Sequence, residues 1–388
     1  MTSAGGAPRG PLSGLLIVDL SRVLAGPFAT MLMADLGARV VKVERPASGD
    51  APGGDDSRTY GPFLDGRSLY FARVNRGKES IAVDLKEPAG AALVRRLAAR
   101  ADVVVENFRP GVLDRLGLGA EVLLAANPRL VVTSISGFGQ TGPWRQRPAY
   151  DAVVQGLAGL ISVTGRPGET PVKPGIPVAD LAAGLYAFGG TLAALHAARE
   201  TGRGTHLDVA MYDASLSLLE GAALRYLATG EDPPLIGNAH HAIAPFDTFS
   251  TRDGLLTICA ANDALWGALC VVLEAPHLLT DGRYATNAGR HGHLDTLKPD
   301  LEAALVRRDT AEWARRLAAA GVPHGTVAGV GEALTSEQAQ ARRMVVDAGG
   351  LGVPGQPLKL STYDDPASRP AEPTLDQHGD ALRAEFAW

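Results

Sequence analysis

Asp180 is the strongest candidate for a catalytic carboxylate in this chain of 388 residues. It follows the turn-rich stretch PVKPGIPVA and precedes a segment of Ala, Gly and Leu that predicts a helix. That position predicts the N-cap or first turn of the helix, where the helix dipole favours an ionised carboxylate. An N-cap Asp is usually structural, but a carboxylate beside a glycine-rich crevice can also attack an acyl group as a nucleophile. By itself the position leaves both roles open.

Basic residues recur where the predicted strands and loops end. In parallel α/β sheets, ligands bind at the carboxyl ends of the strands. Phe108, between Asn107 and Arg109 in ENFRPG, adds an aromatic ring beside these donors. The pattern therefore predicts a site for a polyanionic ligand with a nucleotide end, although each basic residue alone is typical of a solvated surface. The basic residues are Lys42, Arg45, Arg76, Lys78, Lys86, Arg109 and Arg115.

The elements that position these residues follow from alternating β-branched runs and helical segments, which are typical of a parallel sheet covered by helices. Strands are expected at 15–20, 39–44, 80–85, 102–105, 130–135 and 206–211, and helices at 27–36, 87–100, 180–200 and 212–227. A further strand is expected at 255–260, with helices near Asp263 and Thr310 and a short strand at 358–361. The predicted fold class is α/β, with a large Rossmann-like parallel-sheet domain and a smaller α/β domain. The predicted boundaries are 1–225 for the large domain, 226–328 for the small one, and 329–388 for a segment that returns to the large domain.

Composition narrows the classes of function. With 46% hydrophobic and 20% charged residues and a formal charge of -5, the chain is expected to be a soluble enzyme-like protein without nucleic-acid partners. Two cysteines, Cys259 and Cys270, predict neither a disulfide framework nor a zinc site and fit a cytoplasmic location. No secretion signal is expected at the N-terminus. The uncharged stretch 181–198 reaches the lower length limit of a membrane-spanning helix, but its glycines favour a buried helix and no membrane association.

Several common chemistries lack their motifs. The turn after the first strand reads SRVLAGPFAT, without G-x-G-x-x-G, so dinucleotide binding is not indicated. The chain has no phosphate-loop motif GxxxxGK[ST] and no nucleophile elbow GxSxG. His240 and His241 do not form an H-E-x-x-H pattern. Phosphate-loop NTPase, serine hydrolase and zinc hydrolase functions are therefore not indicated.

Several long motifs occur in one order along nearly the whole chain. They are LLIVDLSRVLAGPFATMLMADLGARVVKVERP, SIAVDLKEPAG, DVVVENFRPGVLDRLGLG, SISGFGQTGPWRQRPAYDAVVQGLAGLISVTG, PVADLAAG and TGRGTHLDVAMYDA. In these motifs the chain resembles the family III CoA-transferases, a group related to the alpha-methylacyl-CoA racemases. The resemblance implies an interlocked homodimer, with coenzyme A or acyl-CoA and a carboxylic acid as substrates. It also implies no tightly bound cofactor and no metal.

The resemblance assigns roles to individual positions. Asp180 falls on the catalytic aspartate, which forms an aspartyl anhydride and then an aspartyl-CoA thioester. Matching positions are Leu24 and Ala25 for the thioester end, Arg45 and Val83 to Lys86 for the adenosine and phosphate end, Asn107, Phe108, Arg109 and Arg115 for further CoA contacts, and Tyr150 and Asp151 for the entry. Lys42, Arg76 and Lys78 receive no role and are expected to be structural or solvated.

Departures from the family pattern favour some subgroups over others. Racemases carry His where this chain has Tyr150, and a phenol is a poor base at neutral pH, which favours transfer over racemisation. Leu24 replaces a glutamine of the formyl-CoA transferases, which argues against oxalate or formate. The form GNAHHAIAPF is typical of members that act on dicarboxylic acyl groups such as succinyl-CoA, and Arg22 or His240 is then a candidate for the second carboxylate. A racemase or epimerase with Asp180 as base and a non-catalytic acyl-CoA binding protein remain the alternatives.

Overall fold

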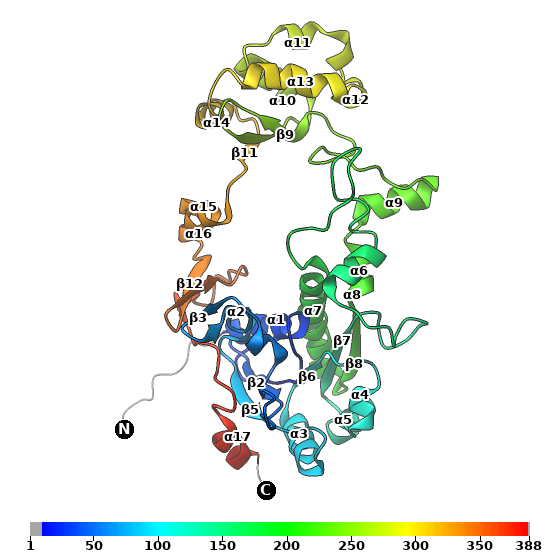
Figure 1. The fold of residues 1–388 in the computed structure, drawn as a ribbon, viewed down its shortest axis with the longest axis vertical. Coiled ribbons are helices and arrows are strands. Elements are labelled where there is room, and N and C mark those ends of the chain that lie inside the picture. Colours follow the sequence, from blue (N-terminus) through cyan, green and yellow to red (C-terminus); the bar gives the residue numbers. More distant parts are fainter. Residues whose placement is uncertain (1–9, 387–388) are drawn as a thin grey trace. The chain divides into compact units, whose positions relative to one another are not determined.

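The computed structural model describes residues 10–386, which group into two compact units. Unit 1 contains residues 10–160, 173–228 and 336–386, and unit 2 contains 161–172 and 229–335. Figure 1 shows the chain coloured along its sequence. The segment 161–172, which the sequence-based division places in the large domain, groups with unit 2. The predicted boundaries of the folding domains stay a prediction.

Unit 1 is built on a six-stranded parallel sheet, which confirms the predicted α/β class with a large parallel sheet. The strand order is β5-β2-β1-β6-β7-β8. Valine and isoleucine fill these strands, and almost every strand residue before β8 is buried, as expected for a sheet covered on both faces. The strands are β1 (Leu16–Asp19), β2 (Arg39–Glu44), β5 (Glu79–Ala82), β6 (Val103–Glu106), β7 (Val131–Ser136) and β8 (Thr205–Ala210).

Helices cover both faces of this sheet. On one face α1 (Ala25–Asp35) and α7 (Val178–Thr201) share a hydrophobic core with alternate strand residues. On the other face α3 (Pro88–Arg100), α5 (Ala120–Ala126) and α17 (Gly379–Glu385) share a second core. Gly184 lets α7 approach α1 closely, since a Cβ there would lie 2.8 Å from the carbonyl oxygen of Ala25.

Among the described residues, α7 is the helix that is long and apolar enough to cross a membrane. Its buried residues, such as Ala183, Ala187 and Leu195, belong to the core that α7 shares with α1 and the sheet. Burial in unit 1 therefore accounts for part of the apolar composition of α7.

The remaining elements of unit 1 include two departures from the predicted ones. The helix expected at 212–227 is two helices, because the chain turns at Leu218 and Leu219 and Glu220 adopts φ +40°. The strand expected at 358–361 is absent, and strands on either side of that range form a sheet of order β13-β12-β14. These elements are η1 (Asp56–Thr59), β3 (Phe63–Leu64), β4 (Arg67–Ser68), α2 (Leu69–Asn75), α4 (Val112–Arg115), α6 (Asp151–Leu157), α8 (Met211–Ser217), α9 (Glu220–Thr229), α16 (Glu337–Ala341), β12 (Val345–Ala348), β13 (Leu351–Pro354) and β14 (Ser368–Arg369).

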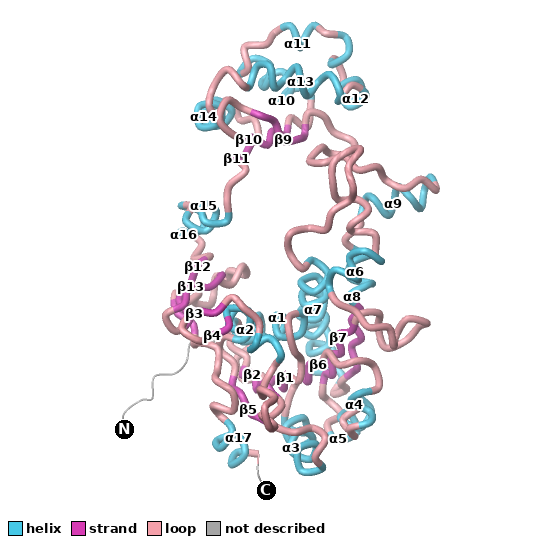
Figure 2. Tube along the Cα trace, in the orientation of Figure 1, coloured by secondary structure: helices cyan, strands magenta, loops and turns pink. Residues whose placement is uncertain are grey.

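Unit 2 packs helices against a three-stranded antiparallel sheet of order β11-β10-β9. Its core contains Trp266, Trp313 and Tyr284, and both cysteines lie here as free thiols at the predicted strand and helix. Figure 2 shows that loops also make up much of the chain between β7 and α7, which includes the segment 161–172 of unit 2. The elements of unit 2 are β9 (Phe246–Ser250), β10 (Leu255–Cys259), α10 (Asp263–Val272), α11 (His277–Thr280), η2 (Gly282–Tyr284), α12 (Asn287–Gly292), α13 (Leu294–Leu305), α14 (Thr310–Ala319), β11 (His324–Thr326) and α15 (Val330–Thr335).

Candidate active site

The site lies at the carboxyl edge of the parallel sheet, where the strand order reverses between β1 and β6. Chains leaving two adjacent strands in opposite directions open a crevice at such a point. Two cavities occupy this edge, and Arg22 and Phe108 line both of them. We call them the Asp180 cavity and the Arg45 cavity after one residue in each.

The Asp180 cavity has a volume of about 290 Å³ and is formed by the loops that follow β1, β6, β7 and β8. Asp180 enters it from the first turn of α7. Tyr150 stands at this cavity with 76% of its surface exposed, in keeping with its predicted place at the entry. The predicted residues that line the cavity are Leu24, Ala25, Asn107, Phe108, Arg109, Tyr150, Asp151 and Asp180.

The Arg45 cavity has a volume of about 460 Å³ and lies at the ends of β1, β2 and β5. Arg45, Lys86 and Arg115 are exposed beside its apolar wall, so cations surround a space with room for a ring. The predicted residues that line it are Arg45, Val83, Lys86, Phe108 and Arg115. The structure thus brings every residue to which the resemblance assigned a role to one of the two cavities, whereas the candidate His240 lines neither.

The loop after β1 separates the two cavities and is held in a strained conformation. Val23 adopts φ +68°, which a β-branched residue rarely does. Both carboxylate oxygens of Asp55 accept the Val23 N–H at 3.1 Å. Asn107 accepts the Arg22 N–H at 2.8 Å and donates to the Arg22 carbonyl at 2.7 Å. Asn107 therefore fixes the loop backbone in addition to lining the cavity.

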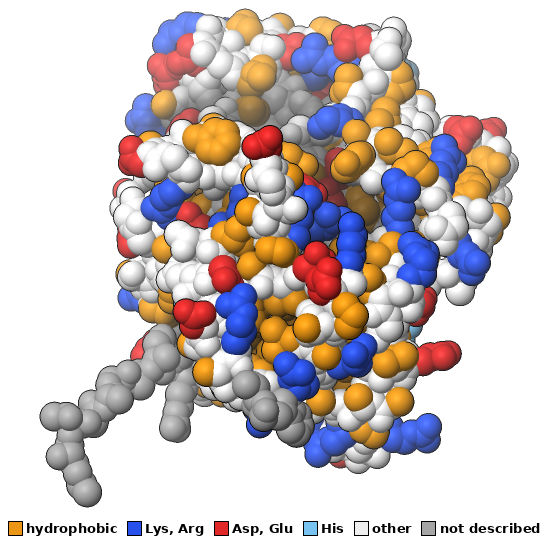
Figure 3. Space-filling view, turned by 60° about the horizontal axis from the view of Figure 1, so that its bottom comes forward, with side chains coloured by type: hydrophobic (Ala, Val, Ile, Leu, Met, Phe, Trp, Pro, Cys, Tyr) orange, Lys and Arg blue, Asp and Glu red, His pale blue; other side chains and the backbone are white. Residues whose placement is uncertain are grey.

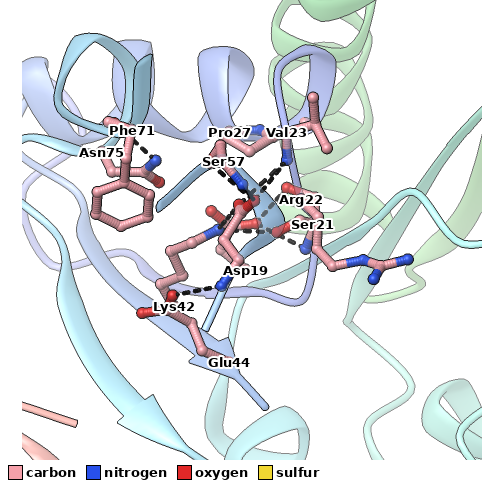
Figure 4. A network of polar contacts seen from close by, with 12 residues as sticks. Asp19, Ser21, Arg22, Val23, Pro27, Lys42, Glu44, Ser57, Phe71 and Asn75 are labelled. Carbon is pink, nitrogen blue, oxygen red and sulfur yellow. Dashed lines mark hydrogen bonds and ion pairs between the residues drawn. The ribbon is translucent and has the colours of Figure 1, made fainter. Parts of the chain in front are cut away.

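A network of buried ion pairs lies beneath this loop (Figure 4). Lys42 pairs with Asp55 at 3.0 Å and donates to the Ser21 carbonyl at 2.9 Å, while Lys78 pairs with Asp19 at 2.9 Å. All four charged side chains are fully buried. Burial disfavours the ionised form of Asp19, but Lys78 and Lys42 outweigh it and lower the pKa of Asp19. The network supports the loop from inside the fold.

Three of the basic residues at strand ends are buried, although the sequence pattern predicted that they would line a site for a polyanionic ligand. Lys42, Lys78 and Arg76 are buried in ion pairs, and Arg76 bonds Asp35 on α1 at 2.5 Å. Their role is structural, one of the two roles expected for them, and none is solvated. Because position at a strand end does not reveal the direction of a side chain, the strand-end pattern alone could not separate Lys42 from Arg45, whereas the family resemblance did.

Asp180 is the third residue of α7 and does not cap it, because Pro177 occupies the N-cap. Asp151 instead supplies the capping carboxylate: its Oδ1 accepts the N–H groups of Ala179 at 2.9 Å and Asp180 at 3.3 Å. Its Oδ2 accepts from Gln155 Nε2 at 2.6 Å. The carboxyl of Asp180 is thereby left free to face the cavity.

Burial raises the pKa of Asp180 to about 7, the negative charge of Asp151 adds to this rise, and Arg73 opposes it. The sequence-based expectation of a readily ionised carboxylate is therefore wrong for this residue. Near neutral pH a carboxyl with this pKa exists in both forms, which suits a group that is charged in one step and acylated in the next. Sequence reasoning missed Arg73, whose only signal is a lone Arg in LYFARVN.

Asp180→Asn is expected to stabilise the protein at pH 8 and to leave its stability unchanged below about pH 4. The folded wild type retains the Asp180 proton up to about pH 7, whereas the unfolded chain loses it near 3.8. The wild type thus loses stability between these pH values, by at most about 4 kcal/mol at about 1.4 kcal/mol per pKa unit. Urea unfolding across pH 4–8 measures this, with exposed Asp364→Asn as the control. A pH-independent difference would contradict the raised pKa.

Other potential centres are less informative. Among residues 10–386 no group of three His, Cys, Asp or Glu side chains is placed to hold a metal ion. A third cavity of about 700 Å³ lies within unit 2 between Gly237, Asp247 and Lys298. Lys298 there already pairs with Asp247 at 2.7 Å. None of the predicted site residues lines this cavity.

Comparison with known proteins identifies the family. The family model for CoA-transferase family III matches residues 12–379. This chain belongs to the family III CoA-transferases. An acetyl-CoA:oxalate CoA-transferase of Acetobacter aceti is 47% identical over 381 residues, covering 98% of this chain and 97% of that protein. A human succinyl-CoA:glutarate CoA-transferase is 38% identical over 374 residues, covering 95% and 84%.

Solved structures agree with this family III assignment. A CAIB/BAIF family protein from Brucella suis has a TM-score of 0.87 and 40% identity, covering 97% of this chain and all of that one. The protein Rv3272 of M. tuberculosis has a TM-score of 0.86 and 30% identity, covering 97% and 100%. The resemblance drawn from the motifs is thus confirmed, and the chain is an enzyme of this CoA-transferase family.

Proposed function

We propose that this family III CoA-transferase moves CoA from an acyl-CoA donor to a carboxylic acid by covalent catalysis at Asp180. The observation that carries the proposal is the position of the Asp180 carboxyl. It lies in a cavity that adjoins a second cavity rimmed by Arg45, Lys86 and Arg115. The second cavity suits the adenosine and phosphates of CoA, and the first suits its thioester.

The proposed reaction is a series of acyl transfers through the Asp180 carboxyl. The Asp180 carboxylate attacks the thioester carbonyl. CoA then leaves as the thiolate, which gives a mixed anhydride of Asp180 and the donor acid. The thiolate attacks the Asp180 carbonyl carbon, which releases the donor acid and forms an aspartyl-CoA thioester. The acceptor carboxylate displaces CoA to form a second anhydride, and the thiolate takes the acceptor acyl group and restores Asp180.

Backbone N–H groups at the start of α1 are suited to stabilise the negatively charged oxygen that forms when a carbonyl is attacked. Ala25 is the first residue of α1 and lines the Asp180 cavity. The first N–H groups of a helix have no partner within the helix, and its dipole is positive at that end. Donors fixed in this way stabilise the negative oxygen of a tetrahedral intermediate without reorganising. Because Asp55 and Asn107 hold the loop before α1, we assign them to positioning.

We propose a dicarboxylic acid, free or as its CoA thioester, as one substrate. Named relatives act on oxalate, glutarate, mesaconate and D-citramalate, with succinyl-CoA as the donor in several names. Leu24 and the segment 237–246 argued against oxalate on sequence grounds. The 47% identical relative named for oxalate weakens that argument, so oxalate belongs in the acceptor panel.

We also propose the homodimer that the resemblance implies, and its interlocking. Exposed hydrophobic side chains on α7 and α9 support self-association, since α9 buries none of its residues within this chain. Leu185, Tyr186, Leu224, Tyr226 and Leu227 are 50–80% exposed. Figure 3 shows that hydrophobic side chains are interspersed with charged ones on the face of the molecule that it draws. A cytoplasmic location stays a prediction.

Intact-protein mass spectrometry tests the covalent step. Brief incubation with acetyl-CoA or succinyl-CoA, followed by hydroxylamine trapping and peptide mapping, is expected to label the peptide that contains Asp180. Asp151 lies in a different segment and serves as the internal comparison for the mapping. The Asp180→Ala variant should remain unlabelled. A label on Asp151 instead would contradict the assignment.

The same incubation in deuterium oxide separates the alternatives. A racemase or epimerase would bring solvent deuterium into the alpha position of an acyl-CoA without any acceptor acid. A binding protein would bind CoA without label or exchange. Because a carboxyl with a pKa of about 7 also suits a base, exchange without an adduct would favour the racemase.

A further inference from the structure

We propose that Arg73 forms an anion subsite of the Asp180 cavity and binds the carboxylate of a dicarboxylic substrate that does not react. This inference rests on the proposed CoA transfer at Asp180 and adds a residue that determines which acid is used. It follows from where Arg73 lies, from what its guanidinium lacks, and from the charge that such a substrate brings.

Arg73 is not itself a lining residue of the Asp180 cavity, but aromatic contacts connect it to Tyr60, which is one. Its guanidinium carbon lies 3.7 Å from the centre of the Tyr70 ring, one turn earlier on α2. Tyr70 packs edge-to-face against Tyr60 at 5.3 Å, and Tyr60 lines the Asp180 cavity. Arg73 is also near enough to Asp180 to oppose the rise in its pKa. Stacking on Tyr70 holds the plane of the guanidinium in one orientation beside the site.

The guanidinium of Arg73 has donor capacity that the protein does not use. Its Nε is buried and has no hydrogen-bond partner. Within the part of the chain that the structure describes, Arg73 forms no ion pair, whereas Arg22 and Arg45 share Asp56 at 3.2 and 2.9 Å. A buried donor without an acceptor is costly and uncommon in folded proteins. An oxygen ligand would remove this cost.

A diacid substrate brings a second carboxylate that does not react, and a cation at a fixed position in the site would stabilise its charge. The reacting carboxylate loses its charge when it becomes an anhydride, but the second carboxylate stays ionised through every step. It would enter a site that already contains the Asp151 carboxylate, whose charge repels it. A guanidinium matches a carboxylate through two parallel N–H donors, one of them Nε. The Nε of Arg73 has no partner in the protein.

The two candidates from sequence are less suited to this role. Arg22 is already paired with Asp56, and its side chain is 42% exposed. Burial and the charge of His241 lower the pKa of His240, so His240 is neutral at neutral pH. Arg73 combines a permanent charge with a buried Nε that has no partner.

Acceptor pairs of equal chain length test the subsite. With acetyl-CoA as donor, kcat/KM is measured for oxalate and isotopically labelled acetate, succinate and butyrate, and glutarate and valerate; the label is needed because transfer from acetyl-CoA to acetate gives no other net change. Arg73→Met is expected to lower kcat/KM about 30- to 100-fold for the diacid that the wild type uses best, mainly by raising KM. The matched monoacid should change less than about threefold. Arg73→Lys should fall between, since it retains the charge without the fork. Arg129→Met, an exposed arginine away from both cavities, is the control.

Each outcome decides the proposal. Equal losses for diacid and monoacid would overturn it, because Arg73 would then act on Asp180 or on the fold. A wild type that prefers monoacids would also overturn it while leaving CoA transfer intact. No transfer to any acid, with no adduct on Asp180, would reject the proposed function as well. Thermal unfolding and CoA binding show whether each variant is folded, and if Arg73→Met does not fold, Arg73→Lys decides with the same acceptor pairs.

Discussion

Asp180→Ala is expected to abolish CoA transfer, lowering kcat by at least about 10⁴-fold. The reason is that the proposed reaction passes through a bond to the Asp180 carboxylate, and no neighbour can replace it. The nearest alternative is Asp151, whose oxygens already accept from Ala179, Asp180 and Gln155. Steady-state assays with acetyl-CoA or succinyl-CoA and a panel of acids measure the loss.

CoA binding should survive this substitution. The residues of the Arg45 cavity are untouched, so a CoA titration should give a dissociation constant within about threefold of the wild type. Asp180→Glu retains a carboxylate but displaces it by one methylene, and a misplacement of that size can cost about 100-fold. Asp364→Ala, an exposed carboxylate outside both cavities, is the matched control. Transfer at the wild-type rate by Asp180→Ala would refute the nucleophile assignment.

Lys42→Met is expected to destabilise the fold by about 3–5 kcal/mol, because it leaves the buried Asp55 carboxylate without its cation. Met has a similar length and fills the space of the lysine stem, so the cost reflects charge more than volume. Asp55 also holds the Val23 N–H, and its disturbance should release the strained loop beside the cavities. Chemical unfolding of purified protein measures the change.

Two further variants separate this effect from general damage. In the double variant Lys42→Met with Asp55→Asn, the uncompensated charge is gone, so the loss should be smaller than that of Lys42→Met alone. The exposed pair of Arg252 and Asp309, at 2.9 Å, is the control, and Arg252→Met should cost at most about 1 kcal/mol. If Lys42→Met and Arg252→Met shift the unfolding midpoint equally, the buried ion pair contributes no more to stability than the exposed one, and the prediction is wrong.

The sheet was predictable because each of its strands is a short run of β-branched residues separated by a helical segment. The range 39–44 agrees residue by residue with β2, whereas other strands shift by one to three positions at their ends. The tail was not predictable in this way. Alternation in LKLS suits a strand, but a strand needs a partner edge, and β12 instead pairs with β13 and β14.

The sequence by itself determined the family, the α/β class and which residues gather at the site, because long motifs are local and parallel strands share one carboxyl edge. Only the tertiary structure decided what each charge does there. Lys42 and Arg45 are three residues apart and both border the Arg45 cavity, yet the side chain of Lys42 is fully buried and that of Arg45 is half exposed. The Asp151 carboxylate accepts the N–H groups at the start of α7, and burial raises the pKa of Asp180. Burial and pairing depend on contacts between distant segments, which no local pattern contains.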